Sequence, residues 1–351
     1  MILYNGVSNL KHKVLLTRHL QLMKQTEEEL EQKLDIVLSP GATEKDILPF
    51  VGDVHGIIAH GTTITDKIIQ AAPLLQVIAT PQVGFDKIDV AAATRAGVAV
   101  IANTGFAPDT VAEFTLGLMI ALARRIVKSD YDLHQRRDWS IRAPYVDPAA
   151  DMGTDLRGAT IGLVGFGFIG SSVAGLCQRA FSANVLAYDP FVTREKMLAQ
   201  GVEKRDSLID MAREVDFLSL HMVLNDATRH LINETVLRAM RPGAYLVNCA
   251  RGEVVDEKAL IMALKNNWIR GAATDVLEQE PINPGNPLLD MPNVIITPHI
   301  AGITVQSSLQ RGQEIVKQML ELLAGKKTKG LANPDVWPKY LQKMIQEDSN
   351  L

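Results

Sequence analysis

The chain has 351 residues, of which 47% are hydrophobic and 22% charged, and its formal net charge is −4 at pH 7. It is too long for one typical domain, and its composition is that of a globular protein with apolar material for two cores. Acidic and basic residues are interspersed, so the sequence shows no basic surface for nucleic acid.

Neither the cysteines nor the N-terminus indicates an exported or membrane protein. Cys177 lies in a helical pattern and Cys249 ends an apolar run, a spacing that fits neither a disulfide framework nor a metal site. The N-terminus lacks the basic and apolar regions of a signal peptide. The most apolar helical stretch, 111–123, is too short to span a bilayer. We therefore expect a cytoplasmic protein with no bound metal and no membrane or nucleic-acid partner.

Short apolar runs alternate with helical patterns up to residue 103. Strands are predicted at 14–17, 36–38, 56–59, 76–79 and 98–101, and helices at 24–34, 66–72 and 90–96. This rhythm is typical of a parallel sheet. One long apolar helix is then expected over 110–127. Glu113 lies near its start and Arg124 and Arg125 near its end, where the helix dipole favours these charges.

The stretch 159–189 has the pattern of a strand, a glycine turn, a helix and a second strand. Gly165 permits a tight turn after the first strand, Gly167 leaves room for a pyrophosphate, and Gly170 lets the helix approach the sheet. The helix that begins at Phe168 and Ile169 would point its free N–H groups at the phosphates. This pattern predicts a dinucleotide site, and its alternative is an ordinary tight turn between a strand and a helix.

Asp189 closes the second strand of this stretch. A carboxylate at this place can accept hydrogen bonds from both hydroxyls of an adenosine ribose, and it would repel a 2′-phosphate. The preferred cofactor is therefore expected to be NAD rather than NADP.

A second series of alternating elements follows, with strands predicted at 217–220, 244–248, 271–276 and 294–297 and helices at 233–240 and 256–266. Beyond them a long helix is predicted over 302–324, and the polar tail 339–351 is expected to be a solvated end. We expect an α/β protein with two domains, each a parallel sheet flanked by helices. A Rossmann cofactor domain, 104–300, would be inserted into a discontinuous flavodoxin-like substrate domain, 1–103 plus 301–351. The chain would then cross between the two domains twice, an arrangement that suits closure of a cleft about a hinge.

Three ionisable residues follow predicted strands at the edge of the second sheet where open α/β sheets bind ligands, namely Arg251, Glu280 and His299. A guanidinium can hold a carboxylate and polarise a carbonyl, and a histidine can deliver a proton. A carboxylate beside that histidine fixes its ring and favours its protonated form. Each residue alone would more often be a surface ion pair, a solvated acid or a structural histidine. Their shared position favours a site for reduction of a 2-keto acid.

The sequence resembles the NAD-dependent D-isomer-specific 2-hydroxyacid dehydrogenase family from about residue 38 to residue 334. The shared motifs are VGFGFIG with Asp189, NCARGEVVDE, ATDVLEQEP and TPHIAG, together with VGFDKID and TVAEFTLGLMIAL nearer the N-terminus. The resemblance implies hydride transfer between NAD(H) and a small 2-keto or D-2-hydroxy acid. The D configuration is implied by the family alone. A homodimer is also implied, with the helix 111–127 at its interface.

The resemblance further implies the roles of single residues. Arg251 would bind the substrate carboxylate and keto oxygen, and His299, paired with Glu280, would be the acid/base. The remaining implied contacts are those of Thr110 with the cofactor phosphates, His221 and the loop to residue 223 with the adenine, Asp275 with the nicotinamide amide, and the backbone of Val83 and Gly84 with the substrate carboxylate.

Departures from the family pattern concern mainly the substrate. Gln82 stands where the family usually has a small residue, so its side chain can narrow the pocket or bond a substrate hydroxyl. The loops 59–61 and 80–82 contain His60 but no arginine, which disfavours phosphoglycerate, because an arginine fork holds phosphate best. Val223 replaces a proline that is frequent in the adenine loop, and we expect a modest effect. The sequence identifies neither the particular 2-hydroxy acid nor the preferred direction.

Two other functions are carried by relatives on this fold. An NADH-responsive binding protein of the corepressor type would be marked by partner grooves or disordered arms, and this chain has only a short polar tail. Formate oxidation resembles the family reaction but lacks the pairing of a glutamate with the histidine, so Glu280 disfavours it. Reduction of a 2-keto acid therefore remains the expected function.

Overall fold

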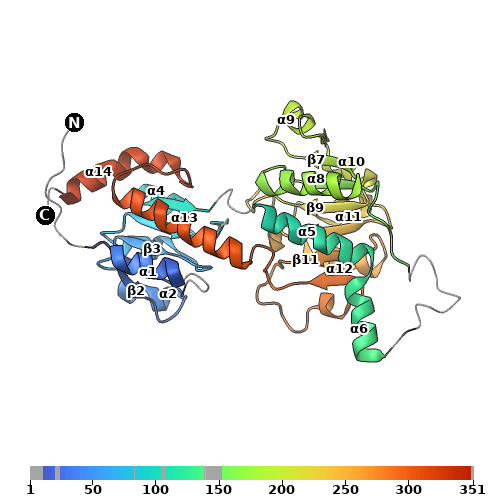
Figure 1. Ribbon diagram of the computed structural model, residues 1–351, viewed down its shortest axis with the longest axis horizontal. Coiled ribbons are helices and arrows are strands. Elements are labelled where there is room, and N and C mark those ends of the chain that lie inside the picture. The colour runs from blue at the N-terminus through green and yellow to red at the C-terminus, as the bar shows by residue number, and fades with distance from the viewer. Residues whose placement is uncertain are drawn as a thin grey trace. The chain divides into compact units, whose positions relative to one another are not determined.

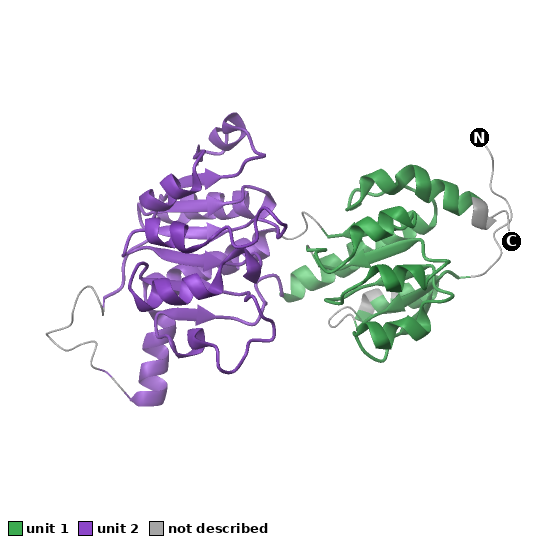
Figure 2. Cartoon of the chain, turned by 180° about the vertical axis from the view of Figure 1, so that it is seen from behind, with its two compact units in different colours: residues 1–107, 304–351 green, residues 108–303 purple. Residues whose placement is uncertain are grey.

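The computed structural model describes residues 11–19, 24–82, 84–103, 108–137, 139 and 152–348; within them, the side chains of 25, 26, 29 and 346–348 are left aside. The chain divides into two compact units (Figure 2). Unit 1 contains Met1–Ala107 and Thr304–Leu351, and unit 2 contains Pro108–Ile303. Unit 2 is therefore inserted in the sequence of unit 1. The sequence-based domain boundaries at 103/104 and 300/301 lie close to these and stay a prediction.

Unit 1 is built on a five-stranded parallel sheet with the order β2-β1-β3-β4-β5. This is the flavodoxin-like order, in which the strand sequence reverses between β1 and β3. The strands are β1 (Lys13–Leu16), β2 (Asp35–Leu38), β3 (Gly56–Ile58), β4 (Val77–Thr80) and β5 (Ala99–Ala102). The helices are α1 (Lys24–Lys33), α2 (Glu44–Ile47), α3 (Asp66–Gln70), α4 (Val90–Arg95), α13 (Val305–Leu323) and α14 (Trp337–Asp348), with 3₁₀ turns η1 (Leu48–Phe50) and η5 (Pro334–Val336).

Both faces of this sheet are buried, which explains why its strands are apolar without alternation. Val14 and Leu16 pack on one face against α1, α13 and α14, where Ile315 and Tyr340 are fully buried. Leu15 points to the other face and packs with apolar residues of α2, α3 and α4. The sheet is thus the middle layer of three.

Unit 2 contains a seven-stranded parallel sheet with the order β12-β11-β10-β9-β6-β7-β8. Six of these strands follow the Rossmann order, β12 adds a seventh, and the order reverses between β6 and β9. The strands are β6 (Thr160–Val164), β7 (Asn184–Tyr188), β8 (Glu203–Lys204), β9 (Phe217–Leu220), β10 (Tyr245–Asn248), β11 (Gly271–Thr274) and β12 (Val294–Ile296).

Helices cover both faces of the second sheet (Figure 1). α5 (Pro108–Ala123) and α8 (Phe168–Phe181) pack on one face, and α10 (Leu208–Glu214), α11 (Glu234–Ala239) and α12 (Glu257–Lys265) on the other. The remaining elements are α6 (Ile126–Arg136), α9 (Arg194–Leu198), η3 (Gly252–Val254) and η4 (Pro287–Asp290). The two parallel sheets flanked by helices confirm the fold class expected from the sequence.

The single helix expected over 110–127 is a wrong prediction, because two helices occupy this region. α5 ends at Ala123, and Arg125, with φ of 54°, lies in the left-handed region just before α6. The carbonyl of Ala123 accepts a hydrogen bond from the backbone N–H of Thr154 (2.8 Å) instead of a helical partner. A contact with a distant segment thus ends a helix whose local pattern would continue it.

The solvated tail expected over 339–351 is also wrong for its described part. α14 spans Trp337–Asp348, and the fully buried Tyr340 donates a hydrogen bond to the carbonyl of Leu322 (2.7 Å). Lys343, one of the polar residues that suggested a solvated end, donates a hydrogen bond to the carbonyl of Leu75 (2.6 Å). The sequence pattern also did not predict α2, α9, α10 and the two-residue strand β8.

Among the described residues, every helix is too short or too polar to cross a membrane.

We predict that docking of α14 stabilises unit 1 through Tyr340. Tyr340→Ala should lower the free energy of unfolding by about 3–5 kcal/mol, and Tyr340→Phe by about 1 kcal/mol through loss of the hydrogen bond. Urea denaturation followed by circular dichroism measures both changes. Ile345→Ala, at a site that is 66% exposed on the same helix, is the matched control. Equal effects at residues 340 and 345 would contradict this account.

Candidate functional site

The glycine turn lies after β6, at the point where the strand order of the second sheet reverses. Gly165 has φ of 92°, and a Cβ atom there would lie 2.8 Å from the carbonyl carbon of His221 after β9. A Cβ atom on Gly170 would lie 2.3 Å from the carbonyl oxygen of Gly165, whereas one on Gly167 would meet nothing within 4 Å. Two glycines therefore close the turn onto the sheet, and the third leaves open space above it, as a bound pyrophosphate requires.

Asp189 fixes the geometry of this turn. Its Oδ2 accepts a hydrogen bond from the backbone N–H of Phe166 (2.8 Å), and its Oδ1 accepts one from the N–H of Phe191 (2.8 Å). An ionised carboxylate has about four lone-pair positions, so each oxygen can accept a further bond. The acid that the sequence assigns to the ribose is thus held beside the glycine turn with acceptor capacity to spare.

His221 lies opposite the turn, at the end of β9. Its Nε2 is 2.9 Å from Ser219 Oγ, and its buried Nδ1 has no hydrogen-bond partner among the described residues. Burial lowers the pKa of His221 to about 3, so the ring is neutral at physiological pH. A buried polar atom without a partner at a strand-order reversal is the kind of group that a bound nucleotide would satisfy.

Three other predicted cofactor residues lie around the same turn. Phe168 and Ile169 begin α8 directly after Gly167, and the side chain of Phe168 is 67% exposed. Thr110 is in the first turn of α5, next to Asp109, which accepts a hydrogen bond from Ser172 of α8. This bond holds the start of α5 against the start of α8. The residues therefore fit a dinucleotide with its phosphates at the N-terminus of α8.

Glu280 and His299 are joined directly. His299 Nδ1 is 2.8 Å from Glu280 Oε2, while Glu280 Oε1 accepts a hydrogen bond from the backbone N–H of Leu277 (3.1 Å). Both side chains are partly exposed, at 43% and 38%. With Nδ1 facing the carboxylate, Nε2 is the ring nitrogen that can exchange a proton with a substrate.

Asp275 holds the loop on which His299 lies. Its buried carboxylate accepts hydrogen bonds from Thr297 Oγ1 (2.5 Å), the N–H of Ile300 (2.9 Å) and the N–H of Ala301 (2.7 Å). Its backbone carbonyl also accepts from the N–H of His299 (2.8 Å), whose φ of 58° lies in the left-handed region. The family resemblance implies a contact of Asp275 with the nicotinamide amide, which stays a prediction. The geometry shows that Asp275 is a clamp that keeps His299 in an otherwise uncommon conformation.

Arg251 follows β10, and its loop presses on the loop that follows β11. A Cβ atom on the adjacent Gly252 would lie 1.9 Å from the carbonyl carbon of Leu277, so only glycine fits there. The buried Asn248 fixes the loop of Arg251 through two hydrogen bonds. Its Nδ2 donates to the carbonyl of Arg251 (2.9 Å), and its Oδ1 accepts from the N–H of Ala250 (3.0 Å). Arg251, Glu280 and His299 thus follow three neighbouring strands, β10, β11 and β12.

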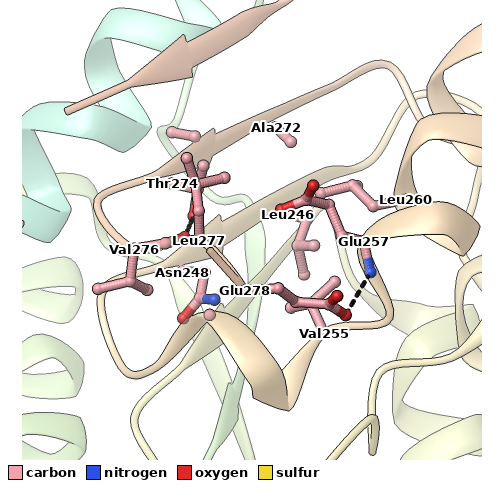
Figure 3. Close-up of a pocket in the computed structure, with 12 residues that line it drawn as sticks. Leu246, Asn248, Val255, Glu257, Leu260, Ala272, Thr274, Val276, Leu277 and Glu278 are labelled. Atoms are coloured by element: carbon pink, nitrogen blue, oxygen red, sulfur yellow. Dashed lines mark hydrogen bonds between the residues drawn. The ribbon is translucent and has the colours of Figure 1, made fainter. Parts of the chain in front are cut away.

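A small pocket lies behind these loops, between β10, β11 and α12 (Figure 3). Its walls are mostly apolar, with Leu246, Val255 and Leu260 among the lining residues. Glu278 on its rim accepts a hydrogen bond from the backbone N–H of Glu257 (3.0 Å). Arg251, Glu280 and His299 are not among its lining residues. The pocket is therefore distinct from the set of Arg251, Glu280 and His299.

The predicted substrate loop of unit 1 follows β4. Gln82 Oε1 accepts a hydrogen bond from the backbone N–H of Gly61 (3.1 Å), and the N–H of Gln82 donates to Thr80 Oγ1 (3.3 Å). The side-chain oxygen of Gln82 is therefore used to brace this loop against the loop after β3. Gly84 lies in the same loop, whereas Val83 is outside the described residues.

Two arginines that sequence reasoning missed lie around His60 in the same unit. The pKa of His60 is lowered by burial and by the positive charge of Arg18, with a smaller contribution from Arg311. Arg18 comes from the segment after β1 and Arg311 from α13, so neither belongs to the loops 59–61 and 80–82. The strand order of unit 1, which puts β1 beside β3, was the available signal for Arg18.

Together these observations describe a class of protein: a nucleotide-binding α/β protein with an Arg, Glu and His set after three adjacent strands. The D-isomer specific 2-hydroxyacid dehydrogenase NAD binding domain matches residues 116–301, more than half of the chain. The chain belongs to this family of NAD-dependent oxidoreductases. This assignment supports an enzyme over a corepressor-like binding protein.

Individual relatives agree with the family assignment. A glyoxylate reductase of Aeropyrum pernix is 40% identical over 78% of this chain and 82% of its own. A D-3-phosphoglycerate dehydrogenase of Methanocaldococcus jannaschii is 36% identical over 90% of this chain and 59% of its own. Among solved structures, the NADPH-dependent glyoxylate/hydroxypyruvate reductase of Sinorhizobium meliloti, in complex with NADP and malonate, has a TM-score of 0.81 and 27% identity, covering 93% of this chain and 98% of its own.

We predict that Asp275→Asn loosens the loop 297–301. Asparagine keeps one acceptor oxygen where the carboxylate has two, and hydrogen bonds to a charged group are worth about 1.5–3 kcal/mol each. Amide hydrogen exchange at Ile300 and Ala301 should therefore accelerate by roughly tenfold or more. Asp290→Asn, an exposed acid in the same unit, is the control and should leave both amides unchanged. If amide exchange at Ile300 and Ala301 is unaltered in Asp275→Asn, the role of Asp275 as a clamp is refuted.

Proposed function

We propose that this enzyme reduces a small 2-keto acid to the D-2-hydroxy acid with NADH, using His299 as the proton donor, Glu280 as its partner and Arg251 as the substrate-binding cation. The observation that carries this proposal is the 2.8 Å contact between His299 Nδ1 and Glu280 Oε2, held in place by the Asp275 clamp. Glyoxylate and hydroxypyruvate are the first substrates to test, since relatives are named for them. The D configuration rests on the family.

NADH, when bound, supplies the hydride. Gly165, Gly167 and Gly170 would hold its pyrophosphate, Asp189 the ribose, and the neutral His221 would face it across the strand-order reversal. Asp275 directs three of its acceptor positions at its own loop, so a contact with the nicotinamide amide would use the one that remains.

The protein side chains then control charge and proton at the carbonyl. The Arg251 guanidinium can pair with the substrate carboxylate and polarise the keto oxygen. The Glu280 carboxylate holds the Nδ1 side of the His299 ring, so that an Nε2–H can pass a proton to the oxygen as the carbon becomes tetrahedral. In the reverse direction the neutral ring accepts that proton. Substrate contacts in unit 1 would come from the backbone of residues 83 and 84, beside the loop braced by Gln82.

A cytoplasmic homodimer is part of the same proposal. The exposed apolar side chains on the α6 side of unit 2 support it, since Ile126, Val127 and Tyr131 are 51%, 48% and 54% exposed. Apolar side chains grouped on one amphipathic helix mark an interaction surface. Their sequence neighbourhood is the one that the family resemblance assigns to the dimer.

We predict that His299→Asn abolishes turnover and leaves NADH affinity nearly intact. Asparagine removes the only proposed proton donor, and general acid catalysis contributes about 10²–10⁴-fold. The measurement is NADH oxidation with glyoxylate and hydroxypyruvate, together with NADH binding by fluorescence. His230→Asn, which removes a histidine whose Nε2 contacts Glu278 (2.9 Å), is the matched control. A fully active His299→Asn enzyme would refute the role.

We also predict a preference for NADH over NADPH that depends on the charge of Asp189. Asp189→Asn keeps an acceptor for the N–H of Phe166 while removing the charge that repels a 2′-phosphate. The ratio of kcat/KM with NADPH to that with NADH should therefore rise by about tenfold or more, since a repulsion of roughly 1.4 kcal/mol suffices. Equal use of both cofactors by the unaltered enzyme would contradict the assignment.

A further inference from the structure

We propose that Arg18, His60 and Arg311 form a cationic cluster in unit 1 that binds a second anionic group on the substrate, a carboxylate or a phosphate at the end remote from the keto acid. This inference rests on the proposed function, because it names the class of 2-keto acid that the site takes. The cluster lies entirely within unit 1, at the edge of the sheet where β1 and β3 end.

The backbone brings these three residues to one place. β1 and β3 are neighbours, with Leu16 opposite Ile58. The N–H of His60 donates to Thr17 Oγ1 (3.1 Å), which is also 2.8 Å from Thr62 Oγ1. Thr17 is buried and directly precedes Arg18. The segment after β1 and the loop after β3 are therefore fixed to each other.

Arg311 reaches the same edge from α13. Asn103 at the end of β5 donates from Nδ2 to the carbonyl of Arg311 (2.8 Å) and to the carbonyl of Pro81 (3.2 Å). The guanidinium is oriented by its own helix, since Nε donates to the carbonyl of Ser307 (3.1 Å) and Nη2 to Ser307 Oγ (3.0 Å). An arginine that is held in one orientation binds an anion with little further loss of side-chain freedom.

The electrostatics of the cluster favour an anion. Arg18 and Arg311 both oppose protonation of His60, and the pKa of Arg311 is itself lowered by burial. Arg18 is exposed and forms no ion pair within the described residues. His60 Nδ1 is buried and has no hydrogen-bond partner among them. The positive charges of Arg18 and Arg311 repel each other, and a bound anion would offset this repulsion. The same anion could supply a hydrogen-bond partner for the buried Nδ1 of His60.

The cluster is also coupled to the predicted substrate loop. Gln82 Oε1 accepts from the N–H of Gly61, next to His60, so the two loops keep a fixed separation. A substrate held at the loop of Gln82 would therefore lie beside the loop that contains His60. Arg18 from the segment after β1 and Arg311 from α13 thus supply the positive charge that the loops 59–61 and 80–82 lack. The cluster therefore favours a substrate with an anionic tail.

The test compares 2-keto acids that differ in their tails. Glyoxylate and pyruvate have no second charge, oxaloacetate and 2-ketoglutarate have a second carboxylate, and phosphohydroxypyruvate has a phosphate. The enzyme should show at least about tenfold higher kcat/KM for an anionic-tail substrate than for pyruvate, because charge-assisted hydrogen bonds are the strong ones. Comparing oxaloacetate and 2-ketoglutarate with phosphohydroxypyruvate shows whether the cluster prefers a carboxylate or a phosphate.

Arg311→Leu should lower kcat/KM for the preferred anionic-tail substrate about tenfold more than it lowers kcat/KM for glyoxylate. Arg18→Leu, at an exposed site, should act in the same direction and serves if Arg311→Leu does not fold. Arg95→Leu, an exposed arginine of α4 that pairs with Asp66 (3.4 Å), is the matched control and should not change the ratio. Inhibition of glyoxylate reduction by malonate and succinate gives a second readout, and their Ki values should rise in both cluster variants.

The outcomes separate the two proposals. If no 2-keto acid is reduced and His299→Asn changes nothing, the proposed function fails. If glyoxylate is reduced but neither an anionic tail nor residues 18 and 311 affect kcat/KM or Ki, the function stands and the cationic cluster is overturned as a substrate site.

Discussion

The carboxylate of Asp275 is the constraint on which the candidate catalytic site depends. By accepting bonds from Thr297, Ile300 and Ala301, it folds the chain after β12 back toward β11 and leaves His299 in a left-handed conformation that faces Glu280. Non-glycine residues adopt such a conformation only where their surroundings impose it. The orientation of the proposed proton donor is thus set by the hydrogen bonds of a buried acid.

The features that the sequence predicts well are those encoded within a few residues. The glycine turn after β6 and the positions of Asp189 and of the three residues after β10, β11 and β12 follow from local patterns, because parallel strands bring their carboxyl ends to one edge. The roles of these residues stay a prediction. The break between α5 and α6 depends on a hydrogen bond from Thr154 to Ala123. The docking of α14 depends on the buried side chain of Tyr340. Neither leaves a local signal. Arg18 and Arg311 were missed for the same reason, since their proximity to His60 arises only when β1, β3 and α13 are assembled.

Asp189 shows that a residue of the candidate cofactor site can also be part of the fold. Its two oxygens hold the backbone of Phe166 and Phe191, so the same carboxylate shapes the glycine turn and would select the ribose. Gly252 is comparable, because its missing side chain lets the loop of Arg251 lie against Leu277. Substitutions at such positions alter ligand recognition and local geometry together, which is why conservative variants such as asparagine are more informative there than alanine.

The insertion of unit 2 within unit 1 has a consequence for synthesis of the chain. Val14 and Ile58 share their core with Ile315, Met319 and Tyr340, and Asn333 accepts a hydrogen bond from the N–H of Val100 (2.8 Å). Unit 1, which begins to emerge from the ribosome first, therefore has to wait for residues 315–340 before its sheet is covered, whereas every residue of unit 2 is already available by then. Domains generally fold as units, from the N-terminus onward. Here the order of completion is reversed, and the unit translated second is finished first.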